Sequence, residues 1–199
     1  SKRPATATAA SRPEGANAAD ATCRAAYDRA HTQLAVASSL VFDTETSGFG
    51  GCVLNLGWTL ADGDGKELAA YDRLWCLPRG ERIDSRAYKA HGISLRDLTC
   101  AGSEAVPKVA PELGEFFALV DAARAAGVRI VAHNASFDVS RLNHTAHRHG
   151  LRDGPHLCSA EMLCTMHAAT KHCRLRTRGN QRLKAPRNEE LYRFLFERA

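Results

Sequence analysis

The stretch VFDTETSGF, residues 41–49, constrains the fold of this chain most. A short apolar run leads into Asp43 and Glu45, and a turn at Ser47 and Gly48 follows. Side chains in a β-strand alternate between its two faces, so both carboxylates are predicted to project from the same face. They repel each other unless a cation lies between them, and all-oxygen ligation favours Mg²⁺ or Mn²⁺ over zinc. The alternative is a pair of solvated carboxylates at a strand end, which is a common surface pattern.

Composition limits the class of protein. The 199 residues, of which 44% are hydrophobic, suit one core with a tail. The net charge of +5 permits a polyanionic partner. Seven cysteines without C-x-x-C pairs favour reduced thiols in a soluble intracellular protein, in the cytoplasm or nucleus, with organelle import as a further option. No apolar run is long enough for a membrane span, so no membrane association is expected.

Three segments are expected along the chain. Residues 1–19 are rich in Ala, Thr, Ser, Arg and Pro, and we predict a flexible arm. Residues 20–37 have helical composition and are predicted to be a helical lead-in. Residues 38–199 then form the main domain.

The first half of this domain is predicted to form three antiparallel strands. The apolar runs 52–60 and 68–77 flank ADGDGKE, which is a strong hairpin signal, and both follow the acidic strand. An irregular region is expected over 79–102. A helix with one apolar face is predicted for 107–126, ended by Gly127.

The second half is predicted to continue the sheet. The run VRIVA, 128–132, is sized for a buried strand beside the acidic one. Asn134 or Ser136 can cap the helix that follows, whose first turn holds Asp138. Residues 171–187 are basic, which is typical of a solvated loop and also suits phosphate binding. A last helix is predicted from Asn188, with Leu191, Phe194 and Leu195 as its buried face.

Two motifs in this order resemble the DEDD (DnaQ-like) 3′→5′ exonuclease family. Its first motif, DxET followed by a small turn and an apolar residue, is matched by residues 43–49. Its second motif, HNxxFD, is matched by residues 133–138. The HGI segment at His91 and a strand containing Thr165 and Met166 also look like parts of the family's pattern. The resemblance covers residue 40 to the last residue, and it implies an α/β, ribonuclease-H-like fold. The implied sheet is mixed, with three antiparallel strands and then parallel strands, flanked by helices.

The resemblance also implies an activity. It is metal-dependent hydrolysis of single-stranded or frayed DNA or RNA from the 3′ end to 5′-mononucleotides, with two Mg²⁺ or Mn²⁺ ions. The residues implied as catalytic and metal-binding are Asp43, Glu45 and Asp138. The residues implied as substrate-binding are Thr44, Thr46, Gly48, Phe49, Asn134 and Phe137.

The family's third motif is missing from this sequence. It consists of His or Tyr followed four or five residues later by Asp, but no Asp follows Asp153 and no His follows His172. Tyr192 followed by Glu197 has the wrong frame. We expect that the sequence stops short of the domain's last helix. The alternative is a catalytically silent module of the same fold that binds nucleic acid or a polymerase or replication partner.

Other chemistry-bearing residues are expected to be structural. His144 with His147 has zinc-ligand spacing, but exposed helix residues are the simpler interpretation. The Cys and His residues between 158 and 173 fit no common zinc knuckle. His91 is predicted to fix a loop beneath the site, and Trp58 and Trp75 are predicted to lie in the core or on the sheet.

Overall fold

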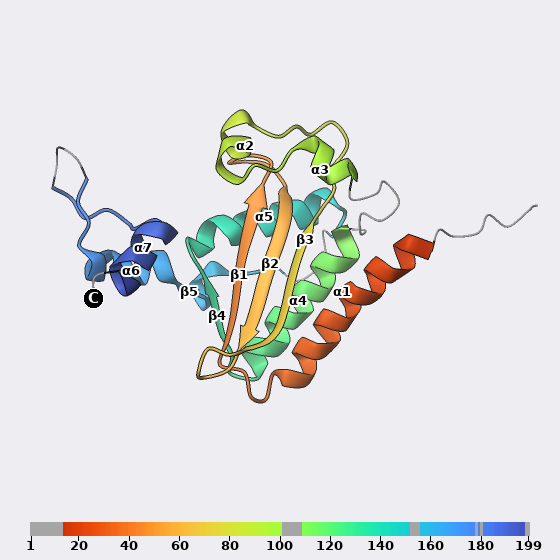
Figure 1. The fold of residues 1–199 in the computed structure, drawn as a ribbon, viewed down its shortest axis with the longest axis horizontal. Helices are drawn as coiled ribbons and strands as arrows, with labels where there is room; N and C mark the ends of the chain where they lie inside the picture. Colours follow the sequence, from red (N-terminus) through yellow and green to blue (C-terminus); the bar gives the residue numbers. More distant parts are fainter. Residues whose placement is uncertain (1–13, 101–108, 152–155, 178, 180, 198–199) are drawn as a thin grey trace, which may run out of the picture.

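A five-stranded mixed sheet forms the centre of the molecule, as predicted (Figure 1). The computed structural model describes residues 14–100, 109–151, 156–177, 179 and 181–197. The strand order is β3-β2-β1-β4-β5. The first three strands form an antiparallel meander, while β4 runs parallel to β1 and β5 runs parallel to β4. The strands are β1 (Ser39–Thr46), β2 (Val53–Ala61), β3 (Glu67–Leu74), β4 (Arg129–Ala132) and β5 (Leu163–Cys164).

The hairpin between β2 and β3 follows from its turn residues. The Asp62 carboxylate accepts hydrogen bonds from the backbone N–H groups of Asp64 at 3.0 Å and Lys66 at 2.9 Å. Gly65 has φ 81°, a conformation that favours glycine. The turn therefore sets the antiparallel register that the ADGDGKE signal predicted.

One face of the sheet carries the core beneath helices α1 (Glu14–Gln33) and α4 (Val109–Ala125). Phe42 of β1 packs edge-on against Phe116 of α4, with ring centroids 5.4 Å apart. Trp58 of β2 lies 5.2 Å from Tyr27 of α1. Both predicted tryptophans are buried, which confirms that they are core residues. On the opposite face of β1, Val41 is 43% exposed.

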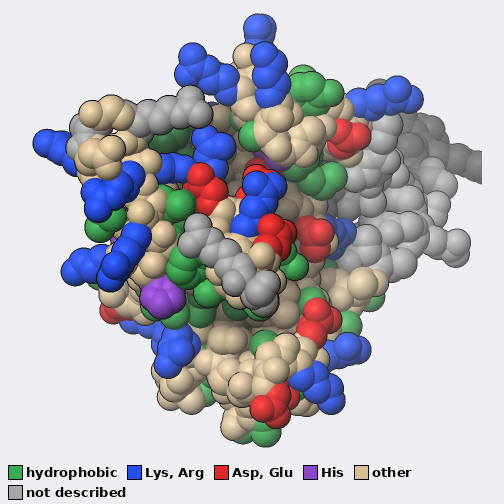
Figure 2. All heavy atoms as spheres, turned by 60° about the vertical axis from the view of Figure 1, so that its left-hand side comes forward, with side chains coloured by type: hydrophobic (Ala, Val, Ile, Leu, Met, Phe, Trp, Pro, Cys, Tyr) green, Lys and Arg blue, Asp and Glu red, His purple; other side chains and the backbone are tan. Residues whose placement is uncertain are grey.

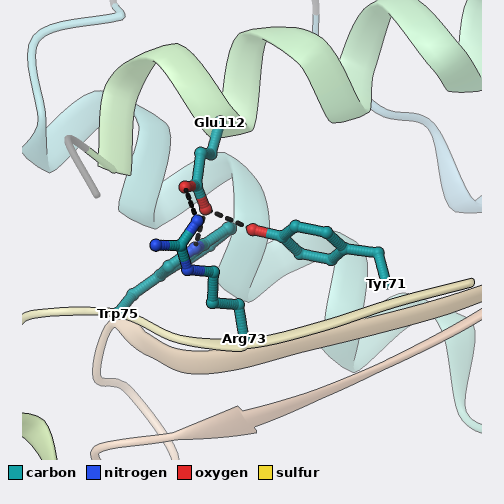
Figure 3. A network of polar contacts seen from close by, with 4 residues as sticks. All are labelled: Tyr71, Arg73, Trp75 and Glu112. Carbon is teal, nitrogen blue, oxygen red and sulfur yellow. Dashed lines mark hydrogen bonds and ion pairs between the residues drawn. The ribbon is translucent and has the colours of Figure 1, made fainter. Parts of the chain in front are cut away.

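A buried carboxylate ties α4 to β3 (Figure 3). Glu112 of α4 accepts hydrogen bonds from the Tyr71 hydroxyl, from Trp75 Nε1 at 2.8 Å and from Arg73 at 3.2 Å. The three donors occupy alternate positions in and just after β3, so they project from one face of the strand. A buried charge is tolerated here because it is paired and hydrogen-bonded.

Helix α1 begins at Glu14, inside the segment predicted to be a flexible arm, and it ends at Gln33 rather than Ala37. The alanine-rich sequence from Glu14 onward favours helix. Residues 1–13 of the predicted arm lie outside the described residues. Within the described ranges, no helix combines the length and the apolar character needed to cross a bilayer.

The region 79–102 is not irregular throughout, because α2 (Ser85–His91) and α3 (Leu95–Cys100) form in it. The Asp84 carboxylate caps α2 by accepting from the Arg86 N–H at 2.6 Å. Gly92 ends α2 with φ 76°. Figure 1 shows both short helices lying beyond the end of β1 where the acidic residues are.

The predicted strand around Thr165 and Met166 is wrong. Only Leu163 and Cys164 pair with β4, and Thr165 begins helix α6 (Thr165–Cys173). The two residues pair with Val131 and Ala132 at the end of β4, so β5 is two residues long. A short 3₁₀ helix, Ser159–Glu161, precedes it.

Helix α7 (Asn188–Phe196) begins where predicted, but its predicted buried face is wrong. Leu195 is 54% exposed, and Leu191 and Phe194 are half-buried. Figure 1 shows α7 beside α6, past the edge strand β5, and the ring of Phe194 lies 5.3 Å from that of His172. The helix thus packs against another helix and not against the main core.

Candidate active site

Strand β1 delivers the two acidic residues of the first motif to one face of the sheet. The residues that precede and separate them, Phe42 and Thr44, are buried, whereas Asp43 and Glu45 retain contact with solvent. Partial desolvation raises the pKa of Asp43, and the adjacent Thr44 N–H and the charge of His133 oppose this. Burial also raises the pKa of Glu45, the charge of Asp43 adds to the increase, and the charge of His91 opposes it. The predicted pair of mutually repelling carboxylates is therefore present.

The third carboxylate comes from helix α5 (Ala135–Arg148), which follows β4 after a turn. Asn134 occupies the N-cap with φ 63° and ψ 45°, and its side chain makes no capping hydrogen bond. Asp138 lies in the first turn and is 2% exposed. Its Oδ1 accepts a hydrogen bond from Thr44 Oγ1 at 2.7 Å.

Burial raises the pKa of Asp138 to about 7. The hydroxyl of Thr44 opposes this increase, and the nearby charge of Asp43 adds to it. The charge of Asp43 thus acts on both other carboxylates of the predicted site. A carboxyl group with this pKa is partly protonated at neutral pH, and a bound cation would favour its ionised form.

The three carboxylates do not share one face of β1. Asp43 and Glu45 project from the more exposed face, whereas Asp138 bonds Thr44, whose side chain lies on the buried face. In the part of the chain that the structure describes, no three His, Cys, Asp or Glu side chains already form a metal-binding group. The donor set still fits Mg²⁺ or Mn²⁺, because it consists of carboxylate oxygens and is short of positive charge.

The side chains of Thr44 and Thr46, both predicted to bind substrate, are used inside the protein. Thr44 bonds Asp138, and Thr46 Oγ1 donates to the Gly48 carbonyl at 3.0 Å. Both threonines are buried. They orient the acidic residue and the turn beside them.

The turn between β1 and β2 is held by Glu81, a residue that the sequence analysis missed. Its Oε1 accepts from Ser47 Oγ at 2.5 Å and from the Cys52 N–H at 2.6 Å. Burial opposes ionisation, but these hydrogen bonds hold the pKa of Glu81 below its usual value. A Cβ at Gly51 would lie 2.0 Å from Ser47 Oγ, so the turn requires glycine there. No local motif marks Glu81, because its partners are about thirty residues away in sequence.

Phe49 stands at the tip of this turn and is 89% exposed. Its ring centroid lies 5.7 Å from that of Phe137 on α5. The two rings line a pocket of about 280 Å³ together with Asn134, Ser136, Ser140 and Arg141. Three of the predicted substrate-binding residues, Phe49, Asn134 and Phe137, are thereby brought together.

Two histidines fix the surroundings of the site. The N–H of Ile93 donates to Nδ1 of His91 at 2.9 Å, so Nε2 of His91 carries the proton and donates to the Thr46 carbonyl at 3.1 Å. The prediction that His91 fixes a loop is confirmed. Nδ1 of His133 lies 2.9 Å from Thr165 Oγ1, and its Nε2 lies 3.0 Å from the Pro186 carbonyl. His133 thus joins the start of the second motif to α6 and to the residues just before α7.

Figure 2 shows the face that contains α6 and α7, with acidic side chains near its centre and Lys and Arg side chains around them.

The described cysteines form no disulfide, namely Cys23, Cys52, Cys76, Cys158, Cys164 and Cys173. Among the described residues, the His and Cys side chains considered above as zinc ligands form no group of three or more that could hold a metal ion.

A comparison with solved structures finds exonuclease X in complex with 5′ overhanging duplex DNA. The TM-score is 0.50 and the identity is 23%, and the match covers 79% of this chain and 72% of that chain. The likeness supports the fold alone, a ribonuclease-H-like mixed sheet flanked by helices. No family model matches the sequence, and no curated protein matches it.

Proposed function

We propose that this chain is a metal-dependent nuclease that removes nucleotides from the 3′ end of DNA or RNA and releases 5′-mononucleotides. The observation that carries this function is the placing of three acids around one end of β1: Asp43 and Glu45 project from one face of the strand, and Thr44 between them bonds Asp138. Purely structural carboxylates are paired, as Glu112 is. A site that keeps three partly buried acids near one another favours the binding of divalent cations.

Asp43, Glu45 and Asp138 would hold the metal ions. When bound, two Mg²⁺ or Mn²⁺ ions supply a nucleophile at neutral pH and neutralise the charge that builds on the phosphate. The protein contributes orientation, because Thr44 fixes the Asp138 carboxylate and the Glu81 hydrogen bonds fix the turn after Glu45.

The exposed ring of Phe49 would receive the terminal base. Aromatic rings stack on any base, which suits an enzyme with little sequence preference. Phe137 supports the ring from α5, and Asn134 supplies polar groups in the same pocket. The neighbour's complex with duplex DNA supports a nucleic-acid substrate. The 3′→5′ direction follows from the family resemblance of the two motifs.

The test is release of mononucleotides from a 5′-labelled single-stranded oligonucleotide with Mg²⁺ or Mn²⁺. We expect stepwise shortening from the 3′ end by the wild-type chain and none by Asp43→Asn. Asp64→Asn is the matched control, because Asp64 is exposed in the hairpin at the opposite end of the sheet. Equal activity of Asp43→Asn and the control would contradict the assignment.

A second candidate function is nucleic-acid binding without hydrolysis, as a module that a polymerase recruits. It is favoured by the bond between Asp138 and Thr44, which places Asp138 on the buried side of β1. The same assay separates the two functions. Retained binding of the oligonucleotide without shortening, for every metal tried, would favour the silent module.

A further inference from the structure

A second and larger pocket is also lined by Phe49. Its volume is about 640 Å³, and it is formed by the turn 47–51, by residues 79–84 and by α5. Its lining includes four basic side chains, Arg79, Arg82, His144 and Arg148, and two acidic ones. Phe49 lines both this pocket and the 280 Å³ pocket that contains Asn134 and Phe137. The exposed ring therefore separates two binding spaces.

The two acidic side chains of the larger pocket are already used by the protein. Glu81 accepts from Ser47 and Cys52, and Asp84 accepts from the Arg86 N–H as the N-cap of α2. These bonds hold the walls of the pocket in place. The two carboxylates do not form ion pairs with the arginines of the pocket.

The basic side chains of the pocket are left for a ligand. Arg79, Arg82 and Arg148 are exposed, and in the described ranges none of their side chains makes a hydrogen bond or an ion pair. Arg148 lies near enough to Glu81 to help lower the pKa of that carboxyl. Burial lowers the pKa of His144, the charges of Arg141 and Arg148 lower it further, and the charge of Glu81 opposes this. The pocket thus holds three arginines against two carboxylates.

One face of α5 connects the two pockets. Arg141, His144 and Arg148 are three and four residues apart, so they lie on the same side of the helix. Arg141 lines the smaller pocket, and His144 and Arg148 line the larger one. The distance along the helix from Arg141 to Arg148 is roughly 10 Å. This length equals the rise of about three base pairs along the axis of B-DNA.

We propose, on the basis of the nuclease function proposed above, that the arginine pocket formed by Arg79, Arg82 and Arg148 binds backbone phosphates beyond the nucleotide that is cleaved. Guanidinium groups bind phosphates through several N–H donors at once, and the three arginines approach one cavity from two separate segments of the chain. The phosphates come either from the opposite strand of a duplex end or from upstream nucleotides of the cleaved strand.

The test compares Arg79→Gln/Arg82→Gln/Arg148→Gln with the wild type in EDTA, which prevents cleavage. Affinity is measured by fluorescence anisotropy at several salt concentrations for three labelled probes: a long single strand, a trinucleotide, and a duplex with a recessed 3′ end. The matched control, Arg24→Gln/Lys66→Gln/Arg129→Gln, removes the same charge from exposed positions away from the pocket.

We expect the pocket variant to bind the long single strand and the duplex about tenfold or more weakly than the wild type does. The slope of log affinity against log salt concentration should become shallower by the equivalent of up to about three phosphate contacts. The control should bind as the wild type does. A loss confined to the duplex identifies the opposite strand, and a loss for the long single strand as well identifies upstream nucleotides. Equal affinities of the pocket variant and the control for both long probes would overturn the assignment.

A separate measurement distinguishes failure of the nuclease function from failure of the pocket. Hydrolysis of the 4-nitrophenyl ester of thymidine 5′-phosphate by the wild-type chain with Mn²⁺ requires only the acidic site. If the ester is not hydrolysed but the pocket variant still loses affinity, the nuclease function fails and the phosphate site stands. If the ester is hydrolysed and the affinities are equal, the phosphate site fails alone.

Discussion

Two buried acids show opposite uses of a carboxylate in this molecule. Glu112, beneath β3, is 6% exposed and accepts from three side-chain donors (Figure 3). Asp138, at the end of β1, is 2% exposed, and its side-chain donor among the described residues is Thr44. The charge of another carboxylate, Asp43, raises its pKa further.

The difference shows which acid the fold needs and which acid a ligand needs. A buried carboxylate with full hydrogen bonding holds two elements together, here α4 and β3. A buried carboxylate that lies near a like charge and has no cationic partner costs stability, and such costs concentrate at functional sites. The role of each acid can therefore be assigned by whether its replacement lowers or raises the free energy of unfolding.

Replacing Glu112 should give the largest loss of stability. Glu112→Ala leaves the buried donors of Tyr71, Arg73 and Trp75 without their acceptor, and we expect a loss of about 3–5 kcal/mol in the free energy of unfolding. Urea denaturation measures it. Glu115→Ala, on the exposed side of the same helix, should change stability by less than about 0.5 kcal/mol. Similar values for the two variants would mean that the network does not stabilise α4.

Replacing Asp138 should change the free energy of unfolding in the opposite direction, toward greater stability. Its pKa in the folded protein, about 7, lies above the usual value of 3.8, so its ionisation costs stability as the pH rises between these values. Without metal, Asp138→Asn should be more stable than the wild type by roughly 3 kcal/mol at pH 8, after allowing for the weakened bond to Thr44.

The pH dependence tests this explanation directly. The advantage of Asp138→Asn should shrink as the pH falls from 7 toward 3.8 and vanish below 3.8, where the wild-type carboxyl is protonated in both states. Thermal denaturation in EDTA at several pH values measures it. A variant that is less stable than the wild type at pH 8 would show that Asp138 is a structural acid like Glu112.

Divalent metal should remove part of that cost. At a free concentration ten times its Kd, Mn²⁺ should stabilise the wild type by about 1.4 kcal/mol, because it binds the folded state only. The stabilisation by Mn²⁺ should be much smaller for Asp43→Asn, and for Asp64→Asn it should equal that of the wild type. Melting temperatures with Mn²⁺ and with EDTA provide the measurement, and no shift for the wild type would exclude a metal site at these carboxylates.

The sequence predicted those parts of the fold that depend on local patterns. Alternation placed Asp43 and Glu45 on one face of a strand, and the apolar run before His133 gave the parallel strand β4. Gly127 ended α4 with φ 77°, as its position indicated. These features depend on neighbouring residues, which a single sequence displays.

Features made by distant residues were missed. Glu81 reaches the turn at Ser47 from over thirty residues away, and nothing near Glu81 marks it as a partner. The exposure of Leu195 depends on where α7 lies, which periodicity alone does not give. The position of Asp138 on the Thr44 side of β1 likewise follows from the packing of α5 and not from the HNxxFD spacing.

The smallest effect is expected at Phe49, where exposure makes stability and binding separable. Because its ring is 89% exposed, Phe49→Ala should change the free energy of unfolding by less than about 0.5 kcal/mol. If a base stacks on it, the affinity for a single strand should still fall by about 1 kcal/mol, near the lower end for such contacts. Tyr192→Ala, an exposed aromatic residue on α7, is the control and should change neither quantity.

Each possible result at Phe49 has a definite meaning. A stability loss comparable to that of Glu112→Ala would show that Phe49 and Phe137 form part of the core, despite the exposure of the Phe49 ring. Unchanged affinity would remove Phe49 from the substrate site. Loss of affinity with unchanged stability would place it with Asp138 among the residues kept for a ligand, because the folded chain gains little from either side chain.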